Sequence, residues 1–153
     1  MIKVLMVCLG NICRSPLAEG ILKSKIDSHK IYVDSAGTGG WHVGELPDKR
    51  SIEVARHHRV DLTKQRCRKF TISDFDKFNF IYVMDKSNYK NVIALARNEE
   101  DKSKVHYILS ITKSHEILEV PDPYYDGNDG FEDVYQMLNE ACDFIADKLN
   151  DNE

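Results

Sequence analysis

The hydrophobic and polar positions of the chain form two kinds of segment. Short runs rich in Val, Ile, Leu and Tyr predict four β-strands, of which the last is the weakest: 2–7, 31–33, 80–84 and 105–109. Longer stretches carry apolar residues three and four positions apart, which predicts helices over four ranges: 16–29, 47–58, 87–97 and 131–149. Pro16 suits the first turn of the first helix, and Ser15 suits the capping position before it.

The order of these elements predicts the fold class. Strands that alternate with helices are typical of an α/β protein in three layers, in which helices cover both faces of an open, four-stranded parallel sheet. Because the chain has no internal repeat and no linker, we expect one domain over residues 1–153. Ligands bind such sheets beyond the carboxyl ends of the strands, which directs attention to four loops: 8–15, 34–43, 85–88 and 121–125.

Composition narrows the class of function. The chain has 153 residues with 21 Lys and Arg against 25 Asp and Glu, and its formal charge of −4 argues against sequence-independent nucleic-acid binding. No apolar run approaches the roughly 20 residues that cross a bilayer, so we expect no membrane span. The four cysteines, at positions 8, 13, 67 and 142, form no CxxC pair and no zinc spacing. We therefore expect a cytoplasmic protein with free thiols, no metal and no cofactor.

The loop after the first strand combines three features of phosphate chemistry. Backbone N–H groups at a helix N-terminus can bind an anion, and the same positive field stabilises a thiolate at Cys8. Arg14 follows six positions later, where its planar guanidinium can hold two phosphate oxygens at once. Ser15 can donate a hydrogen bond to the sulfur when the sulfur leaves. The spacing favours phosphoryl transfer over the alternative of a buried strand end beside a surface arginine.

The stretch Val7–Pro16, VCLGNICRSP, resembles the phosphate-binding loop of low-molecular-weight protein tyrosine phosphatases. The resemblance spans nearly the whole chain, because three further segments recur in the same order: DSAGT at 34–38, MDKSN at 84–88 and DPYY at 122–125. It implies a flavodoxin-like, phosphotyrosine phosphatase I-like fold. It also implies that Cys8 is the nucleophile that forms a phosphocysteine, Arg14 the phosphate clamp and Asp122 the general acid, with no metal required. The rest of the loop would bind phosphate with Arg14: Leu9, Gly10, Asn11, Ile12 and Cys13.

Asp122 and the nearby aromatic residues predict the walls of a pocket. A phenolate leaves poorly unless a carboxylic acid within about 3 Å protonates its oxygen, and the prolines on both sides of Asp122 restrict its carboxylate. Ile12, Trp41 and Tyr124 are expected to enclose a flat phenyl ring, with Tyr125 as a further candidate. Either tyrosine could instead pack on the last helix. The resemblance also suggests that a partner tyrosine kinase phosphorylates the two tyrosines.

Asn11, Ser15 and Ser35 are expected to support the loop from behind. Asn11 can adopt the left-handed backbone of a tight loop and hydrogen-bond across it. Ser35, at the end of the second strand, could reach Asn11. Many relatives carry a histidine within the segment 63–68, where it steadies the loop. This chain has none there, so that support is missing.

The other cysteines and the basic cluster are assigned lesser roles. Cys13 lies five positions from Cys8 on a curled loop, which suggests a reversible disulfide that would protect Cys8 from over-oxidation. Cys67 and Cys142 are expected to be inert, the latter because it lies on the apolar face of the last helix. The basic residues at 64–69 are expected to form a solvated surface that could steer phosphorylated partners. The six histidines show no ligand spacing and receive no role.

Three alternatives share part of this pattern. An arsenate reductase on the same fold needs two further cysteines for a disulfide relay, and neither Cys67 nor Cys142 lies just after the third strand. Phosphoarginine phosphatases of the family tend to carry a threonine at the position of Ile12 and to lack paired tyrosines. A phosphotyrosine-binding module would dispense with Cys8 or Asp122. We therefore expect a monomeric enzyme that acts on phosphotyrosine proteins or small aryl phosphates.

Overall fold

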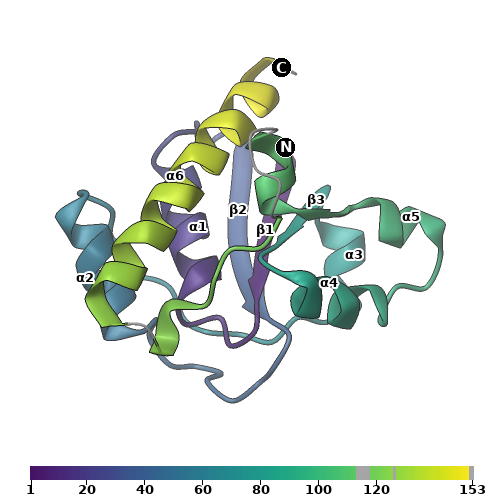
Figure 1. The fold of residues 1–153 in the computed structure, drawn as a ribbon. Coiled ribbons are helices and arrows are strands. Elements are labelled where there is room, and N and C mark those ends of the chain that lie inside the picture. Colours follow the sequence, from purple (N-terminus) through teal and green to yellow (C-terminus); the bar gives the residue numbers. More distant parts are fainter. Residues whose placement is uncertain (113–117, 126, 152–153) are drawn as a thin grey trace.

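The computed structural model describes residues 1–112, 118–125 and 127–151. Its centre is a four-stranded sheet with the order β2-β1-β3-β4, in which all neighbours are parallel. The strands are β1 (Ile2–Cys8), β2 (Ile31–Gly37), β3 (Phe80–Val83) and β4 (Val105–Tyr107). The predicted open, parallel α/β sheet is thus confirmed (Figure 1). Its order changes direction at β1, whose carboxyl end is Cys8, the first residue of the predicted phosphate-binding loop.

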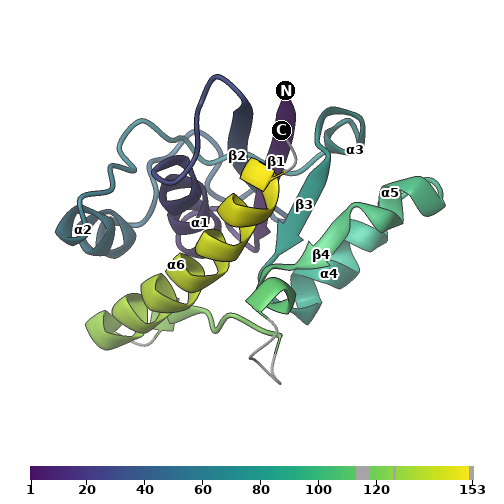
Figure 2. The ribbon, with the colours of Figure 1, turned by 90° about the horizontal axis from the view of Figure 1, so that it is seen from above.

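Helices cover both faces of the sheet. The first face carries α1 (Arg14–Lys23), α2 (Lys49–His57) and the long α6 (Gly127–Asp151). The opposite face carries α3 (Asp74–Lys77) and α4 (Lys86–Ile93), and α5 (Glu99–Ser103) lies beside β4 at the edge. Figure 2 shows the three layers from above, with α1, α2 and α6 on one side of the strands and α3 and α4 on the other.

The central strand is apolar from Val4 onward because both of its faces are buried there. Val4 and Met6 point to the core beneath α1 and α6, whereas Leu5 and Val7 point to the core beneath α3 and α4. All four side chains have no solvent exposure. The run of apolar residues that predicted this strand therefore reflects burial on two sides.

Several predicted boundaries are wrong. The first helix begins at Arg14 and ends at Lys23, and its capping residue is Cys13, not Ser15. Cys13 makes no side-chain capping bond, and the side chain of Ser15 turns toward Cys8. α6 begins at Gly127, earlier than predicted.

The edge of the sheet also differs from the prediction. The strand predicted over 105–109 ends at Tyr107 and continues as a 3-10 helix, η1 (Ile108–Thr112). At Ile108 the chain leaves the edge and packs under α6, so its apolar residues serve the core instead of the sheet. The short helices α3 and α5 were not predicted; α5 is started by the Asn98 side chain, which accepts a hydrogen bond from the Asp101 backbone.

The ends of the sheet have different neighbours. β1 begins and α6 ends at the same end of the molecule, at the top of Figure 1. The carboxyl ends of β1 and β2 lie at the opposite end, together with the loops that follow them. The site is therefore expected at the bottom of this view.

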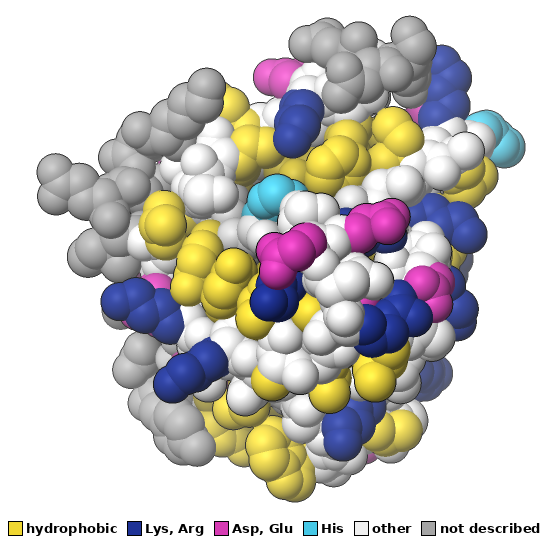
Figure 3. Space-filling view, turned by 90° about the vertical axis from the view of Figure 1, so that its right-hand side faces the viewer, with side chains coloured by type: hydrophobic (Ala, Val, Ile, Leu, Met, Phe, Trp, Pro, Cys, Tyr) yellow, Lys and Arg dark blue, Asp and Glu magenta, His cyan; other side chains and the backbone are white. Residues whose placement is uncertain are grey.

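The surface around α5 is mixed in character. Figure 3 shows basic, acidic and hydrophobic side chains next to one another on this side of the molecule. Within the part of the chain that the structure describes, no helix has the length and apolar character needed to cross a bilayer.

The packing of α6 on α1 gives a prediction about stability. Leu138 is fully buried in the core between α6 and the sheet. Leu138→Ala should lower the free energy of unfolding by about 2–5 kcal/mol, because it removes buried methyl groups and leaves a cavity. Urea denaturation measures the change. Phe144→Ala, on the same helix but 43% exposed, is the control; an equal loss in both variants would contradict this account of the core.

Candidate active site

The loop between β1 and α1 is shaped by contacts with the end of β2. Asn11 has a backbone φ of 58°, the left-handed conformation expected for it. The Thr38 and Gly39 N–H groups donate to the carbonyls of Cys8 and Leu9, at 2.9 and 2.8 Å. A Cβ atom on Gly37 would lie 2.9 Å from backbone atoms of this loop, so β2 must end in glycine for the loop to pack against it.

Cys8 lies at the floor of a cavity of about 320 Å³. Its residue is only 2% exposed, and what is exposed faces this cavity. The cavity is lined by most of the residues that the sequence had singled out, together with His42: Leu9, Gly10, Ile12, Cys13, Arg14, Trp41, Asp122 and Tyr124. Asn11 does not line it. The backbone thus places the predicted nucleophile, clamp and acid around one space.

Arg14 is held in one orientation by Asp85 and by a backbone carbonyl. Its Nη1 donates to Asp85 Oδ2 at 2.7 Å and to the Val120 carbonyl at 2.9 Å. Burial alone would lower the pKa of Arg14, but the negative charges of Cys8, Asp85 and Asp122 outweigh it and raise the pKa. The guanidinium therefore stays charged while it is almost completely buried at the wall of the cavity.

Asp85 was not predicted as a site residue. Its Oδ1 accepts from the Asn88 N–H at 2.8 Å and so caps α4. An aspartate at a helix start is commonly just a capping residue. The sequence therefore does not indicate that the second carboxylate oxygen of Asp85 binds Arg14. The segment 84–88 was recognised only as part of the family pattern.

Asp122 lines the cavity beside Arg14. Its Oδ2 lies 3.7 Å from Arg14 Nη2, and its Oδ1 accepts from the Tyr124 N–H at 3.0 Å. The Val120 N–H donates to the Met84 carbonyl at 2.8 Å, which ties this segment to the end of β3. The carboxylate is thus directed into the cavity, and its side chain remains 37% exposed to solvent.

Aromatic side chains form the rim. Trp41 is 69% exposed and Tyr124 is 40% exposed, so both present open ring surface beside the cavity. Arg50 supports Tyr124: its Nη2 donates to the Tyr124 carbonyl at 2.9 Å, and its guanidinium lies 5.3 Å from the centre of the Tyr124 ring. The side chain of Tyr125 lies outside the described residues, so its predicted place in the pocket stays a prediction.

Two rim residues were missed in the sequence. His42 lines the cavity, and its Nδ1 lies 2.9 Å from Glu45 Oε2, three positions along the same loop. Arg50 lies on α2, far from the loop in sequence. The only sequence feature that could have indicated His42 is its position next to Trp41. No feature of the sequence around Arg50 indicates its contact with Tyr124.

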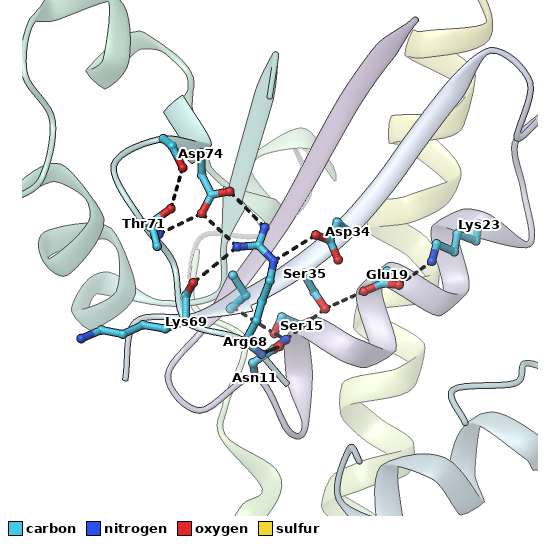
Figure 4. Close-up of polar contacts among 12 residues, drawn as sticks. Asn11, Ser15, Glu19, Lys23, Asp34, Ser35, Arg68, Lys69, Thr71 and Asp74 are labelled. Carbon is cyan, nitrogen blue, oxygen red and sulfur yellow. Dashed lines mark hydrogen bonds and ion pairs between the residues drawn. The ribbon is translucent and has the colours of Figure 1, made fainter. Parts of the chain in front are cut away.

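Behind the loop, Asn11 joins three elements (Figure 4). Its Nδ2 donates to Ser15 Oγ at 2.8 Å and to Ser35 Oγ at 3.0 Å, which confirms the expected contact with Ser35. Its Oδ1 accepts from the Arg68 N–H at 3.0 Å. Ser15 Oγ lies 3.0 Å from Cys8 Sγ, the contact expected for it.

Cys67 contacts the loop from the segment 63–68, in which this chain has no histidine. Its Sγ donates to the Asn11 carbonyl at 2.9 Å. Burial raises the pKa of Cys67 to about 11, so the thiol stays protonated and can donate. That Cys67 is inert stays a prediction; its contact with the loop was not anticipated. Cys142 is fully buried within the apolar core, and burial raises its pKa to about 12.

Metal ligands are not gathered anywhere in the described ranges. Across residues 1–112, 118–125 and 127–151, no group of three or more His, Cys, Asp or Glu side chains could hold a metal ion.

Comparison with known proteins identifies the family. The family model for low molecular weight phosphotyrosine protein phosphatase matches residues 3–153. This chain belongs to that family. The low molecular weight phosphotyrosine protein phosphatase of Schizosaccharomyces pombe is 40% identical to it over 150 residues, which cover 94% of this chain and 95% of the relative.

Solved structures of phosphatases share the whole fold. A protein tyrosine phosphatase from Entamoeba histolytica, crystallised with Hepes in its active site, superposes with a TM-score of 0.92 at 36% identity and covers 99% of both chains. The Drosophila arginine phosphatase superposes with a TM-score of 0.88 at 33% identity, covering 96% of this chain and 97% of its own. Solved structures with this fold thus include phosphatases described by two different substrates.

The Asp85 contact gives a prediction for the anion site. Asp85→Asn should weaken the binding of inorganic phosphate about tenfold, because Arg14 loses a charge-assisted hydrogen bond that orients it. Isothermal titration calorimetry measures the affinity. Glu119→Gln is the matched control, since Glu119 binds the Lys86 N–H beside this site and has no contact with Arg14. Unchanged affinity in Asp85→Asn would refute the orienting role.

Proposed function

We propose that the protein hydrolyses phosphotyrosine monoesters, in proteins or in small aryl phosphates, through a phosphocysteine intermediate. One observation carries the proposal: Cys8, Arg14 and Asp122 surround a single cavity with the sulfur at its floor. We also propose that residues 1–153 act as one phosphatase domain and that the enzyme is monomeric and cytoplasmic.

In the first step the Cys8 thiolate attacks phosphorus and the bond from phosphorus to the phenolic oxygen breaks. Arg14 and the N–H groups of the loop stabilise the charge that develops on the phosphoryl oxygens. Asp122 gives its proton to the departing oxygen, so tyrosine leaves as a neutral phenol. The products of this step are phosphocysteine and ionised Asp122.

In the second step a water molecule attacks the phosphocysteine. Ionised Asp122 takes a proton from that water, because the group that acts as acid in one direction acts as base in the other. The sulfur leaves as a thiolate, which a hydrogen bond from Ser15 stabilises at 3.0 Å. Inorganic phosphate and the starting enzyme result.

The rim favours a flat aromatic group. Trp41 and Tyr124 expose ring surface on the cavity, and Ile12 adds an apolar side chain to its lining. Aromatic rings stack well on such surfaces, and a phenyl ring lying there leaves its phosphate near Cys8. Arg50 holds Tyr124 in place through both its backbone and its ring.

Phosphoarginine is the second candidate substrate, because the chain is similar to the Drosophila arginine phosphatase. The apolar Ile12 argues against it, since a guanidinium needs polar partners when it is desolvated. An arsenate-reductase relay has less support: Cys67 and Cys142 are both buried with raised pKa values, and neither lines the cavity.

A panel of substrates tests the proposed function. Phosphotyrosine, phosphoarginine and phosphoserine peptides of matched sequence should be hydrolysed with phosphotyrosine preferred at least about tenfold in kcat/KM, because only its ring fills the aromatic rim. Cys8→Ser is the matched control and should abolish turnover, since a serine alkoxide is inaccessible at neutral pH. A preference for phosphoarginine would replace the proposal with its alternative.

The role of Asp122 is tested by leaving groups. Asp122→Ala should lower kcat about 10²–10⁴-fold for phosphotyrosine, whose phenolate leaves poorly without a proton. The loss should be much smaller for an aryl phosphate with an acidic phenol. Steady-state rates across a series of aryl phosphates show this difference. An equal loss across the series would remove Asp122 as the acid.

A further inference from the structure

A buried carboxylate lies behind the loop, and neither step of the reaction uses it. Glu19 is on α1, is only 3% exposed and lies five positions after Arg14. Its Oε1 accepts from Ser35 Oγ at 2.6 Å, and its Oε2 pairs with Lys23 Nζ at 2.5 Å. Figure 4 shows that these contacts continue the chain of hydrogen bonds that reaches Asn11 and Ser15.

The direction of every hydrogen bond in this chain follows from its two ends. At one end, the backbone N–H of Arg68 can only donate, so the group of Asn11 that faces it must be Oδ1, and Nδ2 must face Ser15 and Ser35. Arg68 itself is held by ion pairs to Asp34 and Asp74.

At the other end, an ionised carboxylate can only accept. The single hydrogen of the Ser35 hydroxyl is therefore committed to Glu19, and the Ser35 oxygen is left to accept from Asn11. Burial raises the pKa of Glu19, but the hydrogen bonds from Lys23 and Ser35 oppose this rise and favour the charged form.

The arrangement leaves one hydrogen for the catalytic sulfur. Ser15 Oγ accepts from Asn11 at 2.8 Å, so its own hydrogen is free to donate. Two acceptors are within reach: Cys8 Sγ at 3.0 Å and the Ala36 carbonyl at 3.5 Å. The nearer acceptor becomes a charged one when Cys8 is a thiolate, and a charged acceptor takes the hydrogen.

We propose that Glu19 is a positioning residue for Cys8: its carboxylate orients Ser35 and Asn11 so that Ser15 donates its hydrogen to the sulfur. This role deepens the proposed function and rests on it. Without an acceptor at Glu19, Ser35 is free to donate toward Asn11. A Ser35 hydrogen turned toward Asn11 opposes Nδ2, which the Arg68 N–H keeps on that side. Asn11 then loses its hold on Ser35, and Ser15 is held less firmly in the position from which it donates to Cys8.

Glu19→Gln is the sharpest test because it replaces one oxygen by nitrogen. Lys23 can only donate, so it attracts the amide oxygen of the new side chain and leaves the NH₂ group facing Ser35. This NH₂ group and Asn11 Nδ2 then both donate toward Ser35, and the Ser35 hydrogen loses its acceptor. Iodoacetate alkylation of Cys8 at pH 6, relative to pH 9, should fall about fivefold to tenfold, because the thiolate loses a charge-assisted hydrogen bond.

The double variant Glu19→Gln, Ser35→Ala distinguishes a positioning role of Glu19 from a general loss of stability. Because Glu19 acts only through Ser35, Glu19→Gln should change neither the alkylation ratio nor the rate of phosphocysteine hydrolysis once Ser35→Ala is present. Additive losses in the double variant would overturn the proposal, as would an alkylation ratio in Glu19→Gln equal to that of the unmodified enzyme. Burst kinetics with p-nitrophenyl phosphate measure the hydrolysis step.

Controls keep the outcome interpretable. Asp101→Asn alters a carboxylate that is equally buried, on α5, and should leave both readouts unchanged. If Glu19→Gln does not fold, as judged by thermal unfolding, Glu19→Met removes the acceptor and is expected to lower the alkylation ratio in the same way. Failure of the unmodified enzyme to hydrolyse aryl phosphates would refute the proposed function, whereas the alkylation ratio tests Glu19 independently of turnover.

Discussion

The side-chain amide of Asn11 is the junction on which the site depends. It binds α1 through Ser15, β2 through Ser35 and the segment before α3 through the Arg68 backbone. A backbone φ of 58° costs of order 1–3 kcal/mol, so this conformation persists only where the surrounding structure fixes it. Three hydrogen bonds to three separate elements supply that support, so the shape of the loop is a property of the whole fold.

The sheet creates the conditions for this junction. Cys8 and Gly37 are paired at the carboxyl ends of β1 and β2, which brings the chain after β2 against the loop. Parallel neighbours with a crossover helix force the two strand ends to the same side of the molecule. Side chains that are 24 residues apart, Asn11 and Ser35, therefore meet without any local tendency to do so.

Sequence patterns predicted the parts that depend on local chemistry. The strands were found because a two-sided sheet requires unbroken apolar runs, and the loop was found because Cys8, Arg14 and Ser15 are close in sequence. Asp85, Arg50 and Cys67 escaped notice because each acts on a residue at least 56 positions away. Their own surroundings indicate only a helix cap, a surface arginine and a small buried residue.

The separation of the two ends of the sheet has a practical consequence. β1 begins and α6 ends at the end of the molecule that is remote from the cavity. A group attached at either of these two positions would therefore point away from the cavity. A fluorescent reporter or a surface tether joined at either point would leave the aromatic rim open. The geometry therefore suits use of the immobilised protein as a capture or sensing element.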